Sequence, residues 1–165
     1  MSKIFNNKLW GYLGRFSLTH VVTYTGIAVV FVIFQNTMPA SERIALDFFK
    51  PYSQPGFMVI FQQVIRGGVM ALILYPFYDI ILKNNRGWLI LFAALFGLGL
   101  LGSVNPMPGS IEGLIYTKTT LVEHLMVLVT GAIQVFIFSW GFLKWENWCN
   151  HKNITTSNKG IEINE

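Results

Sequence analysis

The chain alternates long apolar stretches with short polar segments, and the stretches have the lengths of membrane-spanning helices. Three of them contain no Asp, Glu, Lys or Arg: residues 16–41, 87–111 and 124–143. A fourth, residues 57–78, is apolar except for one charged residue, Arg66. Because a helix needs about 20 apolar residues to cross a hydrocarbon core about 30 Å thick, each stretch is long enough to span a bilayer.

This pattern predicts an all-α integral membrane protein, folded as a four-transmembrane-helix bundle. The expected spans are residues 17–36, 57–78, 88–104 and 121–143. The segments between the spans are too short to form a second folded domain. We therefore expect residues 1–148 to form a single membrane domain and residues 149–165 to form a polar cytoplasmic tail.

Composition agrees with a membrane protein and argues against a soluble enzyme. Of the 165 residues, 53% are hydrophobic and only 12% are charged, against about 25% charged in an ordinary soluble domain. The single cysteine, Cys149, excludes an intrachain disulfide and a Cys-x-x-Cys redox pair. The formal charge of +4 does not indicate nucleic-acid binding, because the basic residues are spread along the ends of the apolar stretches.

The distribution of these basic residues predicts how the chain is oriented. If the N-terminus is cytoplasmic, eight basic residues lie on that side and three on the other. The positive-inside rule then places both termini in the cytoplasm. Tryptophans near the expected cytoplasmic boundaries, such as Trp10, Trp88 and Trp140, fit an aromatic belt. We expect a multi-pass protein of the plasma or inner membrane, with the lipid bilayer as its surroundings.

The third span contains a literal match to the glycine fingerprint of dinucleotide-binding folds, Gly97-Leu-Gly99-Leu-Leu-Gly102. That fingerprint requires a preceding strand and a soluble βαβ unit, which an apolar span cannot supply. Small residues in a membrane helix instead let neighbouring helices approach closely. We therefore expect these glycines to serve helix packing.

Four ionisable residues lie inside the expected spans, and such residues are costly enough to suggest function. They are His20, Arg66, Glu123 and His124. At 1.5 Å per residue, His20 and His124 lie about 21 Å apart in depth, which argues against one haem clamped between them. We predict no cofactor; a haem held by a single histidine or a metal at His124 is the less favoured alternative.

The outer half of the bundle holds the better candidate site. Gln62, Gln63 and Arg66 fall within one arc of the second span at 100° per residue. If the second and fourth spans are neighbours, Arg66 pairs with Glu123 in a polar pocket that opens outward, with Gln35 near its mouth. The predicted substrate- or ion-binding residues are Gln62, Gln63, Arg66, Glu123, His124, Thr130 and Gln134. The competing interpretation is that these polar contacts only fix helix register.

Three functions fit these observations. The first is an oligomeric transporter, channel or solute-binding protein that uses the outward-facing pocket. The second is a non-catalytic anchor, assembly or signalling subunit whose polar contacts face other membrane subunits. The third is a membrane-embedded enzyme acting on a lipid or quinone, although no recognisable catalytic motif supports one. Expected partners are further copies of the chain or other membrane subunits, and not nucleic acid.

Overall fold

The computed structural model describes residues 2–39, 56–103 and 106–162, with side chains for 8–39, 57–103 and 106–150. Every regular element among these residues is helical, as the sequence predicts. The elements are α1 (Ser2–Thr37), α2 (Gly56–Leu74), η1 (Tyr75–Phe77), α3 (Tyr78–Lys83), α4 (Gly87–Ala93), η2 (Ala94–Leu101), α5 (Ile111–Tyr116) and α6 (Leu121–Glu162).

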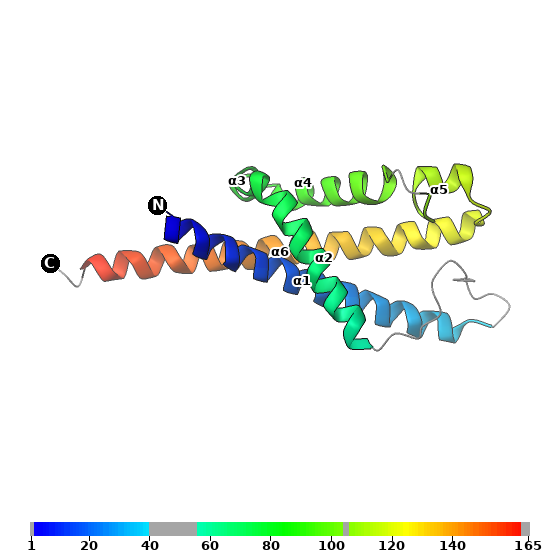
Figure 1. Cartoon of the computed structure of the whole chain (residues 1–165), viewed down its shortest axis with the longest axis horizontal. Coiled ribbons are helices and arrows are strands. Elements are labelled where there is room, and N and C mark those ends of the chain that lie inside the picture. Colours follow the sequence, from blue (N-terminus) through cyan, green and yellow to red (C-terminus); the bar gives the residue numbers. More distant parts are fainter. Residues whose placement is uncertain (1, 40–55, 104–105, 163–165) are drawn as a thin grey trace.

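Two long helices form the axis of the molecule. α1 and α6 pack side by side and run in opposite directions, so the two chain ends lie at the same end of the structure (Figure 1). α2 packs mainly against α1 and crosses it at a steep angle, whereas α4 and η2 run along α6. The chain therefore folds as an α1–α2 pair and an α4–α6 pair, which are joined where α1 contacts α6.

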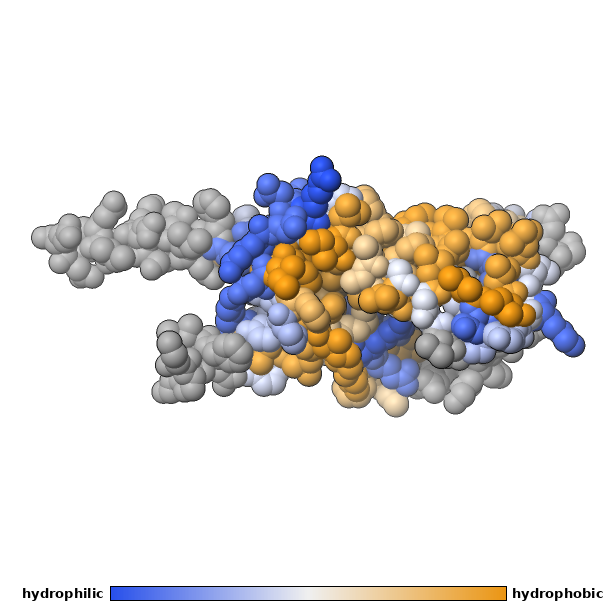
Figure 2. Space-filling model, turned by 90° about the horizontal axis from the view of Figure 1, so that it is seen from above, coloured by the Kyte–Doolittle hydropathy of each residue, from blue (hydrophilic) through white to orange (hydrophobic). Residues whose placement is uncertain are grey.

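Three segments are long and apolar enough to cross a membrane, by length and composition. They are Lys8–Thr37, Phe57–Lys83 and Leu121–Asn150. The helix Gly87–Leu101 is apolar but has only 15 residues, and its second part, η2, is a π-helix. Figure 2 shows a broad hydrophobic surface along the middle of the molecule, as expected where lipid replaces water.

The second span contains a helix break. Pro76 lies in the 3-10 turn η1, which separates α2 from α3. A proline inside a helix lacks an N–H donor and its ring clashes with the carbonyl one turn earlier, so the regular α-helix is interrupted there. The break changes the direction of the chain just before α3 and so positions Tyr78 against α1 and α6.

The side-chain core lies in the half of the molecule nearest the termini. Phe16 of α1 is fully buried, and its ring packs edge-on against Phe138 and Phe142 of α6 at centroid distances of 4.8 and 5.0 Å. Tyr12 packs edge-on against Tyr78 of α3 at 5.1 Å. Edge-to-face pairs at this spacing add to the energy of burial, so the aromatic core is the main contact among α1, α3 and α6.

Gly97 and Gly99 do not make the expected close contact with another helix among the described residues. Gly97 and Gly99 have open space where a side chain would begin, because η2 turns Leu100, not these glycines, toward Gly131 of α6. The close helix contact is made instead by Gly67 of α2. A Cβ at that position would lie 2.9 Å from the Cα of Ser17, so Gly67 is what lets α2 cross α1 tightly.

Candidate functional site

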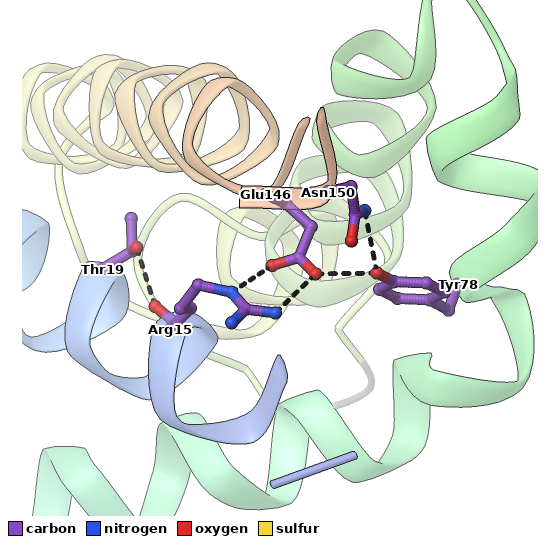
Figure 3. A network of polar contacts seen from close by, with 5 residues as sticks. All are labelled: Arg15, Thr19, Tyr78, Glu146 and Asn150. Atoms are coloured by element: carbon purple, nitrogen blue, oxygen red, sulfur yellow. Dashed lines mark hydrogen bonds and ion pairs between the residues drawn. The ribbon is translucent and has the colours of Figure 1, made fainter. Parts of the chain in front are cut away.

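A buried polar network joins three helices at the end of the molecule nearest the termini (Figure 3). The Arg15 guanidinium donates through Nε and Nη2 to the two oxygens of Glu146, at 2.6 and 2.8 Å. Tyr78 donates its hydroxyl to Glu146 Oε1 at 2.7 Å, and the amide of Asn150 donates to the Tyr78 oxygen at 3.2 Å. We call Arg15, Tyr78, Glu146 and Asn150 the Arg15 network.

The burial of this network indicates that it stabilises the contact among three helices. Glu146 is 0% exposed, and the Arg15 side chain is 23% exposed. The carboxylate accepts three hydrogen bonds, two of them from the bidentate guanidinium, which is the geometry of a strong charge-assisted pair. Its oxygens are therefore committed to α1 and α3, and the arrangement stabilises the junction of three helices rather than presenting a reactive group.

This network was not predicted from the sequence, because Arg15 and Glu146 lie just outside the expected spans. Charged residues at a cytoplasmic boundary are ordinarily exposed, so neither was considered as part of a buried contact. The sequence did contain a signal for the pairing of these two residues. Arg15 precedes the first span and Glu146 follows the fourth, so two opposite charges lie at matching depth on helices that run antiparallel.

Gln63, one of the predicted site residues, is used in helix packing. Its Oε1 lies 3.2 Å from Nε2 of His20, which is 6% exposed and lies on α1. The tight crossing at Gly67 is one turn further along α2. The contact of Gln63 with His20 thus supports the α1–α2 crossing, which agrees with the interpretation that polar groups in the spans fix register.

The expected pairing of Arg66 with Glu123 is not formed. Glu123 turns back onto its own helix end, where Oε2 accepts from the Thr120 backbone N–H at 2.7 Å and from its hydroxyl at 2.8 Å. The Glu123 N–H in turn donates to the Thr120 hydroxyl at 3.3 Å. This reciprocal arrangement is a capping box. It is a local contact within the first turn of α6. The α2 helix, which carries Arg66, packs mainly against α1.

Replacing Glu123 distinguishes the cap from a binding role. Glu123→Gln is expected to leave the melting temperature in detergent nearly unchanged, because glutamine also fills this position of a capping box. Glu123→Ala is expected to lower it by a few degrees at most. If Glu123→Gln is as disruptive as Glu123→Ala, the carboxylate charge itself matters and the capping explanation is wrong.

His124 anchors the loop that precedes α5. Its Nδ1 accepts a hydrogen bond of 2.9 Å from the backbone N–H of Gly109, and the ring is 5% exposed. Gly109 has φ of 89°, and a Cβ there would lie 3.0 Å from a Val127 methyl group. Glycine thus allows both the backbone conformation and the close approach. Within the described residues, no three His, Cys, Asp or Glu side chains gather where they would hold a metal.

Arg66 and Gln62 lie on the exposed side of α2. Among the described residues the ion pairs are Arg15 with Glu146 and Lys83 with Asp79, so no described carboxylate pairs with Arg66. In the candidate span Phe57–Lys83, Arg66 is four residues from the midpoint, or about 6 Å along the helix. A cation is therefore directed out of the molecule near the middle of an apolar span.

An apolar cleft lies elsewhere in the molecule. It is a cleft of about 360 Å³ between the outer halves of α1 and α6, lined by side chains such as Phe31, Phe34 and Met126. Thr130 is its one hydroxyl-bearing lining residue. Gln134 is partly buried one turn further along α6. The structure thus does not bring Thr130 and Gln134 together with Gln62 and Arg66 in one pocket.

Comparison of the chain with protein-family models, curated proteins and solved structures found no match.

Proposed function

We propose that the protein is a non-catalytic subunit of a membrane complex and that it binds an acid-bearing partner helix through α2. The contact surface, called here the Arg66 face, consists of Arg66, Val69 and Ile73, which recur at helical spacing on one side of α2. Val69 and Ile73 are 51% and 65% exposed. The exposed position of Arg66 in an apolar span is the observation that carries the proposal.

An arginine facing lipid at this depth is costly. Insertion scales put a centrally placed Arg at about +2.5 to +3.5 kcal/mol, and such residues ordinarily face a partner, the bundle interior or water. Arg66 is exposed on α2, which packs against α1, so no described helix covers its side chain. A carboxylate on a neighbouring helix removes this cost by pairing with the guanidinium.

A second copy of the chain is a poor source of that carboxylate. Of the described acidic side chains in the candidate spans, Asp79 and Glu146 are already paired with Lys83 and Arg15. The remaining one, Glu123, lies two residues into Leu121–Asn150, whereas Arg66 lies nine residues into Phe57–Lys83. The two are about 10 Å apart in position along their spans. We therefore favour a different chain as the partner over a homo-oligomer.

We propose further that the chain crosses the membrane four times with both termini in the cytoplasm, in a plasma or inner membrane. The two termini and the turn before α4 lie at one end of the structure (Figure 1), and the sequence concentrates basic residues there. α4 and η2, extended by the α5 region beside the start of α6, then make the fourth crossing.

The exposed Arg66 side chain also favours a second candidate function, an anion transporter or channel. In an oligomer, Arg66 faces lining a common path would bind an anionic solute in place of a carboxylate. The lipid or quinone enzyme has no comparable observation behind it, since Glu123 caps a helix and His124 holds a loop.

Arg66→Gln tests the proposal. Native membranes are solubilised gently, and the particle containing the protein is sized and its chains identified. We expect the wild-type protein to be found in a particle with a second chain that carries Asp or Glu in a transmembrane helix. We expect the Arg66→Gln protein to be found without that second chain. Arg86→Gln, which removes an exposed arginine outside the expected spans, is the matched control and should keep the complex.

A wild-type protein purified as a stable homo-oligomer, with anion flux in liposomes that Arg66→Gln abolishes, would contradict the subunit proposal and favour the transporter. A wild-type protein found alone and without flux would contradict both.

A further inference from the structure

A second, polar cleft lies at the opposite end of the spans from the capping box of α6. It has a volume of about 170 Å³ and lies between the turn that joins α3 to α4 and the α6 helix. Its polar lining comes from Asn84 and Asn85 of the turn and from Lys144 and Asn147 of α6. We propose that this cleft binds the phosphate headgroup of an anionic phospholipid.

The charges around the cleft favour an anion. Lys144 contributes its ammonium group, which is held 4.7 Å from the centre of the Trp140 ring. Arg86 is exposed on the turn that forms the opposite wall. No carboxylate is among the lining residues described. Asp79 pairs with Lys83, and the buried Glu146 is committed to the Arg15 network.

The amides supply neutral donors to accompany the cation. The Asn84 Oδ1 accepts from the backbone N–H of Arg86 at 2.8 Å, so the NH₂ end of that amide remains to donate. Asn85 and Asn147 add two more amides. Cations and N–H donors bind phosphate oxygens through strong charge-assisted hydrogen bonds, and this cleft offers both.

The aromatic walls indicate a lipid rather than a free ion. Trp88 and Trp140 line the cleft beside Leu143, and Trp140 is 50% exposed. Tryptophans are enriched at the level of lipid headgroups, where one side of the ring is apolar and the other wet. Figure 2 shows hydrophilic residues directly beside the hydrophobic surface at one end of the molecule. A lipid headgroup in the cleft would thus have its acyl chains against apolar helix surface.

The proposed orientation adds a reason for anionic lipid, because the cytoplasmic leaflet attracts basic residues near its surface. The inference uses that orientation but does not depend on the Arg66 face, so it survives or fails separately from the subunit proposal.

The test is a titration of the purified full chain in detergent with dioleoyl phosphatidylglycerol or dioleoyl phosphatidylcholine, with adducts counted by native mass spectrometry. We expect one phosphatidylglycerol per chain at concentrations where phosphatidylcholine shows no adduct. Lys144→Gln is expected to weaken this binding about fivefold, as for the loss of one cation near an anionic surface. Asn147→Ala is expected to weaken it as well.

Lys118→Gln is the matched control, because it removes an exposed lysine outside the cleft, near the start of α6. It should leave binding unchanged. Equal binding of the two lipids, or unchanged binding by Lys144→Gln, would overturn the proposal. Displacement of phosphatidylglycerol by inorganic phosphate at equal concentration would overturn the lipid assignment and indicate a free phosphate site.

Discussion

Arg15→Met is expected to destabilise the protein by about 3–5 kcal/mol, the cost of breaking a buried ion pair from one side. The variant leaves Glu146, which is 0% exposed, without its guanidinium partner. The Tyr78 hydroxyl still donates to the carboxylate, but one hydrogen bond does not replace a bidentate charge pair. Unfolding of the purified protein in detergent or nanodiscs measures the loss.

Two further variants separate the ion pair from simple loss of packing. Tyr78→Phe removes one hydrogen bond to the carboxylate and is expected to cost less than Arg15→Met, about 1.5–3 kcal/mol. The double variant Arg15→Met with Glu146→Leu removes both charges and should recover much of the stability. The Glu146→Leu single variant completes the comparison. If the double variant loses as much stability as Arg15→Met and Glu146→Leu lose in sum, the two charges are not coupled as described.

Gly87→Ala is expected to cost about 3 kcal/mol, at the upper end of the range for overpacking. Gly87 begins α4 and donates its N–H to the Asn84 carbonyl at 3.0 Å. A Cβ at this position would lie 1.8 Å from the carbonyl oxygen of Ile81. Because that atom belongs to the backbone of α3, the turn itself must open to admit the methyl group. Thermal unfolding of the variant checks the expectation.

Gly26→Ala is the control for Gly87→Ala. Gly26 lies within α1, and no described atom would lie within 4 Å of an added Cβ. Alanine also has the higher helix propensity, so this variant should be as stable as the wild type or slightly more stable. Equal effects of the two substitutions would show that the turn does not depend on glycine.

The helical fold could be predicted from the sequence because apolar stretches of span length have few alternatives. Residues 57–78 were expected to form one span, and α2, η1 and α3 together fill Gly56–Lys83. The third span was expected at 88–104, whereas α4 ends at Ala93 and the π-helix η2 that follows it ends at Leu101. The turn before it was also visible in the sequence, because Asn84, Asn85 and Gly87 are turn-forming residues.

The contacts between polar residues could not be predicted from the sequence. Periodicity shows on which face of its helix a residue lies, but not which other helix packs against that face. Arg66 and Glu123 were expected to pair on the assumption that their spans are adjacent. The steep crossing at Gly67 places α2 against α1 instead. Glu123 also had a local partner three residues earlier in Thr120, and that local contact forms in the structure.

The measurement that tests the central claim most directly is photo-crosslinking from Val69, one turn from Arg66 on the Arg66 face. With a photoreactive residue at this position in cells, we expect a discrete adduct to an Asp- or Glu-bearing transmembrane helix of a different chain, lost in Arg66→Gln. The same probe at Leu98, which is 77% exposed on η2, should give no such adduct. Adducts from Val69 only to a second copy of the chain, or an adduct that survives Arg66→Gln, would contradict the account.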